Sequence, residues 1–170
     1  MNKAVFLDRD GVINKKAALH EYIKKWEEFE FLSGVKIALK KLSNTNYKII
    51  VLTNQRGISR GKMSLKDLND IHSNMLKEIK ISGGKIDSIF FCPHDIEKCD
   101  CRKPSPGMLD KAVEEFNIDL KSSWVVGDSD SDIELGKSRN CKTIYIGKDF
   151  EGADYKVANL NDAVKIIIDN

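Results

Sequence analysis

The stretch AVFLDRDGVIN (4–14) places two carboxylates, Asp8 and Asp10, at the end of an apolar run. An acid in that position commonly caps the following turn, so neither residue alone indicates a reaction. A second run, VVGDSDSD (125–132), also ends on acids, the first of which is Asp128. Carboxylates that converge on one place repel one another unless a cation lies among them. Oxygen ligands suit Mg²⁺, which keeps several waters and accepts further ligands from a phosphate.

A second group of possible metal ligands lies in the stretch CPHDIEKCDC (92–101), which contains three of the four cysteines. Cys92, His94, Cys99 and Cys101 form a C-x-H-x4-C-x-C array. Three thiolates and one imidazole make a closed tetrahedral site, the ligand pattern of structural Zn²⁺. The alternative is a set of separate buried cysteines and a surface histidine. In a reducing compartment, clustered cysteines indicate a metal rather than disulfides, so we favour zinc.

Alternating strands and helices are expected to position these groups. The short apolar runs AVFLD, YKIIVLTN, KIDSIFFC, SWVVGD and KTIYIG alternate with amphipathic segments. This alternation predicts an α/β fold with a doubly wound parallel sheet and helices on both faces. Ligands of such sheets bind at the carboxyl ends of the strands. Asp8, Thr53, Cys92 and Asp128 all stand at those ends.

The segment after the second predicted strand favours one long amphipathic helix, for which Ser64 is a plausible N-cap. Its expected buried face consists of residues spaced by three and four, namely Leu65, Leu68, Ile71, Met75 and Ile79. His72 stands beside polar residues in this segment. We therefore expect the His72 side chain to be exposed.

Composition limits the class of protein. A chain of 170 residues, 41% of them hydrophobic, can bury a substantial core as one domain over 1–170. Its charges are dispersed and sum to only +2, so no basic track for nucleic acid is indicated. Apolar runs fall well short of the roughly 20 residues of a membrane span, and no secretion signal is recognisable. We expect a cytoplasmic monomer without a nucleic-acid or membrane partner.

Four motifs in order carry a resemblance that covers nearly the whole chain. DRDGV (8–12), LTN (52–54), RKPSPGM (102–108) and VVGDSDSD (125–132) match the four motifs of the haloacid dehalogenase superfamily. The chain therefore resembles the phosphotransferases of that superfamily. A single DxD motif is common by chance, whereas four motifs in order with suitable separations are not.

The resemblance implies a role for each matching residue. Asp8 would attack phosphorus and form an aspartyl-phosphate, which splits one difficult displacement into two easier ones. Asp10 would protonate the leaving oxygen and later deprotonate water, a role that favours a raised pKa. Mg²⁺ would be held by Asp8, the backbone carbonyl of Asp10 and Asp128. Thr53 and Lys103 would bind the phosphoryl oxygens.

The cysteine-rich loop before the RKP motif is similar to that of the capless branch of the superfamily, which contains histidinol-phosphate and D-glycero-D-manno-heptose 1,7-bisphosphate phosphatases. The loop TNQRGISRGK (53–62) closely resembles the heptose bisphosphatase signature. This resemblance implies removal of the 7-phosphate of a heptose 1,7-bisphosphate in nucleotide-heptose synthesis. Histidinol phosphate or another small sugar phosphate is the nearest alternative substrate, and a polynucleotide end is a more distant one.

The spacing of the motifs favours an open site without a separate cap domain. About 25 residues separate Asp10 from the helix expected near Val35, too few for an independently folded cap. Specificity must then come from loops, and Asp132 is expected to support Lys103 or a metal-bound water. The candidate substrate contacts are Tyr22, Asn54, Gln55, Arg56, Arg102 and Ser129. Heptose phosphatases often have lysine where this chain has Ser129.

Overall fold

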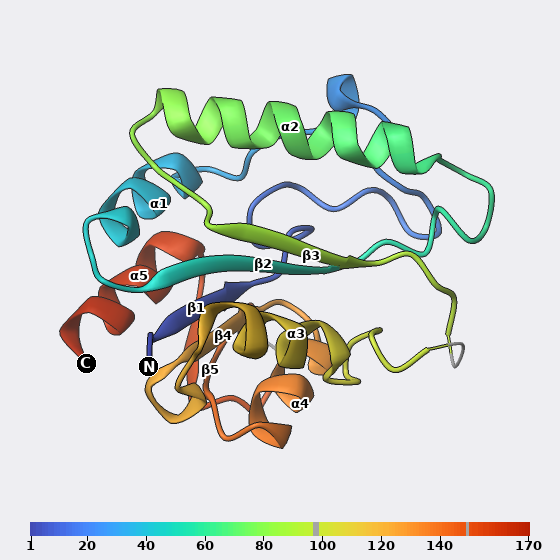
Figure 1. The fold of residues 1–170 in the computed structure, drawn as a ribbon. Coiled ribbons are helices and arrows are strands. Elements are labelled where there is room, and N and C mark those ends of the chain that lie inside the picture. Colours follow the sequence, from blue (N-terminus) through green and yellow to red (C-terminus); the bar gives the residue numbers. More distant parts are fainter. Residues whose placement is uncertain (97–98, 149) are drawn as a thin grey trace.

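A parallel sheet of six strands forms the centre of the computed structural model, which describes residues 1–96, 99–148 and 150–170 (Figure 1). Residues 97 and 98, which belong to the predicted zinc loop, lie outside the described residues. The strand order is β3-β2-β1-β4-β5-β6 and every neighbouring pair is parallel. The strands are β1 (Ala4–Leu7), β2 (Lys48–Asn54), β3 (Ser88–Cys92), β4 (Trp124–Gly127), β5 (Lys142–Ile146) and β6 (Tyr155–Val157). The doubly wound parallel fold is confirmed.

Helices cover both faces of the sheet (Figure 1). One face carries α1 (Val35–Ser43), α2 (Leu65–Ile81) and α5 (Leu160–Asp169), and the opposite face carries α3 (Gly107–Phe116) and α4 (Asp130–Ser138). Two short 3₁₀ helices, η1 (Trp26–Glu28) and η2 (Leu120–Ser122), lie in the connections. The segment between β1 and α1 contains η1 as its one helical element among the described residues.

The central strand β1 is buried on both faces, which explains its uninterrupted apolar sequence. Because successive side chains point to opposite faces, Val5 and Leu7 pack beneath α1, α2 and α5. Ala4 and Phe6 pack on the other side, beneath α3. This strand is therefore held from above and below, and the position at which it ends, just before Asp8, is fixed by the core.

The capping of α2 follows the prediction. The Ser64 hydroxyl accepts a hydrogen bond from the backbone N–H of Asp67, whose carboxylate accepts one from the backbone N–H of Ser64. The buried stripe of this helix includes four of the five predicted residues, Leu68, Ile71, Met75 and Ile79. Leu65, the first residue of the helix, is 50% exposed.

The predicted exposure of His72 is wrong, since this residue is only 7% exposed. His72 follows Leu68 by four positions and precedes Met75 by three, so it belongs to the same buried stripe. Its polar neighbours in the sequence face away from the core. The sixth strand, β6, was also not predicted, because its three residues, YKV, are too few to show a pattern.

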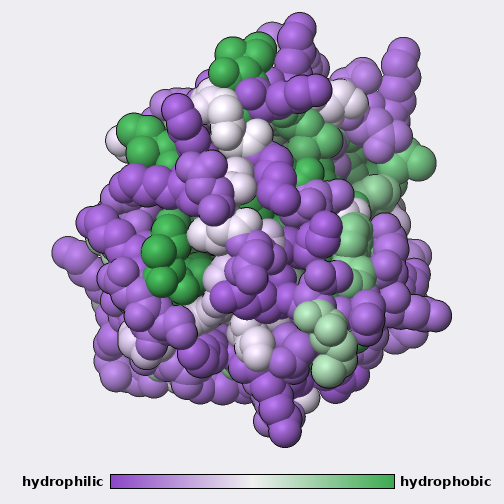
Figure 2. All heavy atoms as spheres, turned by 60° about the vertical axis from the view of Figure 1, so that its left-hand side comes forward, coloured by the Kyte–Doolittle hydropathy of each residue, from purple (hydrophilic) through white to green (hydrophobic). Residues whose placement is uncertain are grey.

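On the face shown in Figure 2, hydrophilic residues predominate and apolar residues form separate groups rather than one broad patch. None of the helices in the described ranges combines the length and the apolarity that crossing a membrane requires.

Candidate active site

The candidate site lies at the carboxyl ends of three adjacent strands, β2, β1 and β4. Leu7 pairs with Val51 on one side and with Val126 on the other, so β1 and β4 end at nearly the same level, while β2 continues three residues further, to Asn54. The backbone N–H of Asp8 continues the ladder by donating to the carbonyl of Val126 at 3.0 Å. Asp128 follows β4 directly. Strand pairing therefore brings Asp8 and Asp128 together from positions 120 residues apart in the sequence.

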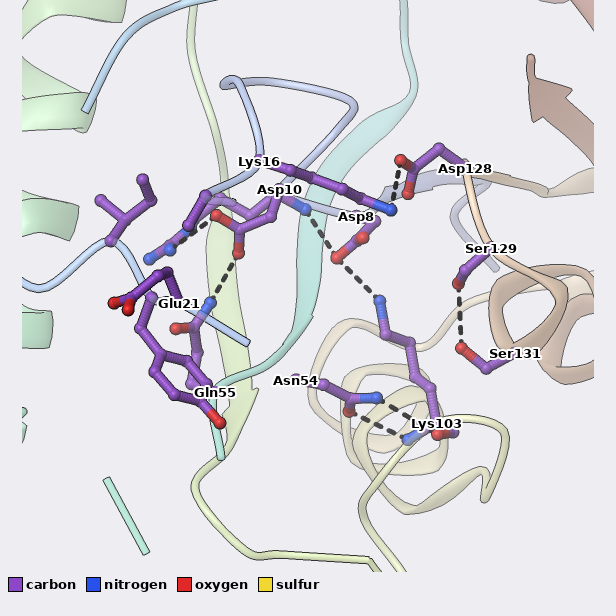
Figure 3. A pocket seen from close by; sticks show the side chains of 14 residues that line it. Asp8, Asp10, Lys16, Glu21, Asn54, Gln55, Lys103, Asp128, Ser129 and Ser131 are labelled. Carbon is purple, nitrogen blue, oxygen red and sulfur yellow. Dashed lines mark hydrogen bonds and ion pairs between the residues drawn. The ribbon is translucent and has the colours of Figure 1, made fainter. Parts of the chain in front are cut away.

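Lys103 provides a buried positive charge at the centre of this edge (Figure 3). Its side chain is 3% exposed, and its Nζ lies 2.8 Å from Oδ1 of Asp8 and 2.7 Å from Oδ1 of Asp132. A third hydrogen bond, of 2.7 Å, goes to the carbonyl of Leu52, so all three ammonium protons have acceptors. Burial acts to lower the pKa of Lys103, but the two carboxylates raise it above its usual value. Asp132 thus supports Lys103, as expected.

Asp8 is strongly perturbed by its surroundings. Burial together with the charges of Asp132 and Asp10 raises the pKa of Asp8 to about 7, although Lys103 acts in the opposite direction. An additional positive charge beside Asp8 would lower this pKa again and favour the carboxylate. The carboxylate is the form that can attack phosphorus.

The pKa of Asp10 departs from our expectation. Burial acts to raise it, but the Arg9 guanidinium and hydrogen bonds from Arg9, Asn14 and Gln55 outweigh burial and lower the pKa below its usual value. The Arg9 Nη2 and Asn14 Nδ2 atoms donate to Oδ1 of Asp10 at 2.9 Å each, and Gln55 Nε2 donates to Oδ2 at 2.9 Å. The expectation of a raised pKa was wrong because Arg9, the residue next to Asp10, folds back onto its carboxylate.

The acids at this edge fit a divalent cation. Carboxylate oxygens of Asp8, Asp128 and Asp132 lie within 4.8 Å of one another. The buried Oδ1 of Asp128 has no hydrogen-bond partner among the described residues, a costly state that a hard cation would relieve. Gly11, at φ +93°, makes room for this carboxylate, because a Cβ there would lie 1.9 Å from Oδ2 of Asp128. The donor set and the unpaired oxygen therefore suit Mg²⁺.

A pocket opens over these groups (Figure 3). Asp8, Asp10, Lys103 and Asp128 line it together with residues of the segment 16–23, which precedes η1. The wall formed by this segment consists of Lys16, Ala17, Glu21, Tyr22 and Ile23. Lys16 and Glu21 were not predicted as site residues, because nothing in their spacing indicates how this segment folds back over the sheet edge.

The candidate substrate contacts are only partly brought to this pocket. Tyr22, Asn54, Gln55 and Ser129 line it, whereas Arg56 is not among the lining residues. Arg102 lies in an adjacent hollow that shares the side chains of Asn54 and Lys103 with the pocket. The two hollows together offer space for a ligand longer than a phosphate group.

Three of these residues also hold other parts of the site. Asn54 accepts from the backbone N–H of Lys103 at 3.0 Å and donates to its carbonyl at 3.2 Å. Gln55 donates to the hydroxyl of the fully buried Thr53 at 2.8 Å as well as to Asp10. The Ser129 hydroxyl donates to Asp132 at 2.6 Å. Asn54 and Gln55 therefore hold groups that the resemblance identifies as catalytic, and Ser129 holds Asp132, which supports Lys103.

The four predicted zinc ligands lie together beside this site. The Sγ atom of Cys101 is 3.1 Å from Sγ of Cys92 and 3.2 Å from Sγ of Cys99, and His94 Nδ1 is 3.4 Å from Sγ of Cys101. Burial raises the pKa of Cys92 and of Cys101, whereas hydrogen bonds from the other two thiols overcome burial and lower the pKa of Cys99 to about 7. The cluster could hold one metal ion. Its last member, Cys101, stands two residues before Lys103 in the same loop.

Comparisons with known proteins agree with this geometry. A family model described as polynucleotide kinase 3 phosphatase matches residues 3–166, which makes the chain a member of that family. D-glycero-alpha-D-manno-heptose-1,7-bisphosphate 7-phosphatase of Photorhabdus laumondii is 44% identical over 157 residues, which cover 86% of this chain and 82% of the relative. The chain belongs to the heptose 1,7-bisphosphate 7-phosphatases of the haloacid dehalogenase superfamily.

Other heptose bisphosphate phosphatases differ in the anomer that their names give. D-glycero-beta-D-manno-heptose-1,7-bisphosphate 7-phosphatase of Rhodopseudomonas palustris is 36% identical over 162 residues and covers 91% of this chain and 86% of the relative. Among solved structures, the D,D-heptose 1,7-bisphosphate phosphatase of B. bronchiseptica, complexed with magnesium and phosphate, superimposes with a TM-score of 0.90 at 30% identity. That alignment covers 98% of each chain.

Proposed function

We propose that this protein is a Mg²⁺-dependent phosphatase that removes the 7-phosphate of D-glycero-D-manno-heptose 1,7-bisphosphate. One observation carries this proposal: the buried Lys103 ammonium holds Asp8 at 2.8 Å, beside the unpaired oxygen of Asp128, at the floor of a pocket. This arrangement provides a nucleophile, a fixed positive charge and a cation site within one sheet edge. Membership of the heptose 1,7-bisphosphate 7-phosphatases supports the choice of substrate.

In the first step an oxygen of Asp8 attacks phosphorus, and the bond between phosphorus and the sugar oxygen breaks. Lys103 and the backbone N–H of Arg9 both donate to Oδ1 of Asp8, at 2.8 Å each, which orients this carboxylate. The leaving sugar oxygen takes a proton from Asp10. The enzyme is then phosphorylated on Asp8, and the sugar departs as its monophosphate.

In the second step water attacks the phosphorus of the aspartyl-phosphate, and the bond to the Asp8 oxygen breaks. Asp10 takes a proton from the attacking water and inorganic phosphate leaves, so Asp8 is again a carboxylate and Asp10 again carries the proton that it donates in the first step. Because the pKa of Asp10 is lowered, this residue rests as a carboxylate and suits the second role directly. For the first role it takes up a proton with the substrate, whose negative charge raises the pKa of a nearby acid.

Two metal ions complete the proposed enzyme. Mg²⁺, held by Asp8, the backbone carbonyl of Asp10 and Asp128, would offset the repulsion between the anionic nucleophile and the anionic phosphate. Zn²⁺ would bind Cys92, His94, Cys99 and Cys101 in a structural site without an open position. Its task would be to hold the backbone that leads into Lys103.

The sugar would lie between the segment 16–23 and the hollow beside Arg102. This hollow continues from the pocket past Asn54 and Lys103. The Arg102 guanidinium is suited to a bidentate grip on a second phosphate, which a bisphosphate offers and a simple sugar phosphate does not. We expect the α anomer to be preferred, because the relative at 44% identity bears that name.

Phosphate release tests this proposal. Wild-type protein with Mg²⁺ is assayed on both anomers of heptose 1,7-bisphosphate, on histidinol phosphate and on a 3′-phosphorylated oligonucleotide, with Asp8→Asn as the blank. The proposal expects kcat/KM for the α anomer of heptose 1,7-bisphosphate to exceed kcat/KM for each other substrate by several hundredfold, a difference of roughly 3 to 4 kcal/mol in transition-state binding. Preference for histidinol phosphate or for the oligonucleotide would reject heptose and keep the phosphatase.

A further inference from the structure

His72 of α2 is a buried titratable group that the proposed mechanism does not use. Its Nε2 lies 3.2 Å from Nη1 of Arg9, within hydrogen-bond distance. Since a guanidinium can only donate, Nε2 must be the unprotonated nitrogen of the ring, and the proton of the neutral imidazole must be on Nδ1. The ring also packs edge to face on Phe91, with centroids 6.2 Å apart. The position and the tautomer of His72 are thus both set by its neighbours.

Arg9 connects this ring to the active site. Its side chain is 1% exposed, and while Nη1 donates to His72, Nη2 donates to Oδ1 of Asp10 at 2.9 Å. The guanidinium is a planar, rigid fork, so fixing one of its nitrogens fixes the direction of the other. The Nε2 acceptor of His72 on α2 therefore determines the orientation in which the Arg9 guanidinium binds the carboxylate of Asp10.

We propose that His72 is a positioning residue, which fixes Arg9 so that Asp10 is held in place for proton transfer to the leaving oxygen. This inference rests on the proposed function of Asp10. Without an acceptor at His72, the Nη1 protons of Arg9 would lose the partner that the described residues offer, at a cost for a buried donor. The fork would then turn to regain a partner, and Asp10 would lose the hydrogen bond from Arg9 that helps to align it.

The remaining contacts of Asp10 indicate that this loss would affect alignment rather than folding. Asn14 and Gln55 still donate to its two oxygens when Arg9 turns. A leucine at position 72 would fill the same space in the apolar stripe of α2. A glutamine would add an acceptor near the place of Nε2 and could still bind Arg9.

The dependence of rate on the leaving group distinguishes positioning from a general structural effect. An alkyl phosphate needs a proton on its leaving oxygen, whereas p-nitrophenolate leaves without one. In His72→Leu we expect kcat/KM to fall about tenfold or more for the alkyl phosphate and less than threefold for p-nitrophenyl phosphate. His72→Gln should recover most of the loss, and the packing control Met75→Leu should leave the ratio of the two rates unchanged.

The proposal would be overturned if kcat/KM of His72→Leu fell equally on both substrates or did not fall at all. It would also be overturned if His72→Gln did not recover kcat/KM for the alkyl phosphate. A second measurement does not depend on activity. In the full-length protein labelled with ¹⁵N-histidine, the imidazole of residue 72 should show a protonated Nδ1 and an unprotonated Nε2 at neutral pH. A protonated Nε2 would contradict the hydrogen bond to Arg9 even if the protein proved to have another substrate or no phosphatase activity.

Discussion

The Nζ of Lys16 lies 2.6 Å from Oδ2 of Asp128, so a side chain from the pocket wall neutralises the carboxylate proposed to hold Mg²⁺. Lys16 is half exposed, whereas Asp128 is largely buried. Burial acts to lower the pKa of Lys16, but its contacts with Asp128 raise it above its usual value, so the lysine is a cation at neutral pH. The ammonium and the metal therefore compete for one carboxylate.

Lys16→Met should accordingly strengthen Mg²⁺ binding. A partly exposed ion pair contributes up to about 1 kcal/mol, so we expect Kd for Mg²⁺ to fall by as much as roughly fivefold in isothermal titration calorimetry. Lys15→Met is the matched control, because Lys15 pairs with the exposed Glu30. Unchanged or weaker binding in Lys16→Met would show that this lysine does not oppose the metal.

Lys103→Met should reduce both stability and turnover. The substitution leaves the carboxylates of Asp8 and Asp132 facing one another without their shared ammonium, and breaking a buried pair costs about 3 to 5 kcal/mol. Urea unfolding measures this loss. Adding Asp132→Asn should recover part of the stability but not the turnover, and full additivity of the two substitutions would argue against their coupling.

The zinc cluster makes a separate prediction. Purified protein should contain about one equivalent of Zn²⁺ by elemental analysis, and Cys101→Ser should lose it together with thermal stability and phosphatase activity. Cys141→Ser is the control, since Cys141 is buried outside the cluster. Metal-free protein of full stability would refute the structural role.

His72 should make stability depend on pH. Burial and the charge of Arg9 lower the pKa of His72 to about 3, from about 6.5 in the unfolded chain. Below pH 6.5 the unfolded state binds a proton that the folded state does not, so stability falls as the pH falls toward 3. Between pH 6.5 and 5.5 we expect the free energy of unfolding to fall by about 1 kcal/mol more in the wild type than in His72→Gln. Parallel pH profiles in urea unfolding would contradict this.

The sequence predicted those parts of the molecule that local patterns determine. Asp8 and Asp128 stand where apolar runs end, and parallel pairing alone places such ends side by side. The C-x-H-x4-C-x-C spacing likewise predicted that the four zinc-ligand candidates lie close together, and their ligand atoms lie within 4.8 Å of one another. The burial of His72 also follows from the spacing of α2, because His72 lies four residues after Leu68 and three before Met75, although its neighbours in the sequence are polar.

The features that the sequence did not reveal depend on side-chain direction. Arg9 folds back on Asp10 and lowers its pKa, and no spacing rule indicates which way an arginine in a turn will point. Lys16 reaches Asp128 only because the segment 16–23 returns over the sheet edge. Such contacts between irregular segments arise from tertiary packing and leave no periodic signal in the chain.

Detection of a phosphoryl group on Asp8 tests the central claim most directly. Turnover of heptose 1,7-bisphosphate with Mg²⁺ is quenched with acid, which preserves an acyl phosphate, and the peptide that contains residues 4–14 is examined by mass spectrometry. The account predicts one added phosphoryl group on Asp8 in wild type, and neither this group nor phosphate release in Asp8→Asn. Sustained phosphate release by Asp8→Asn, or a phosphoryl group on another residue, would contradict it.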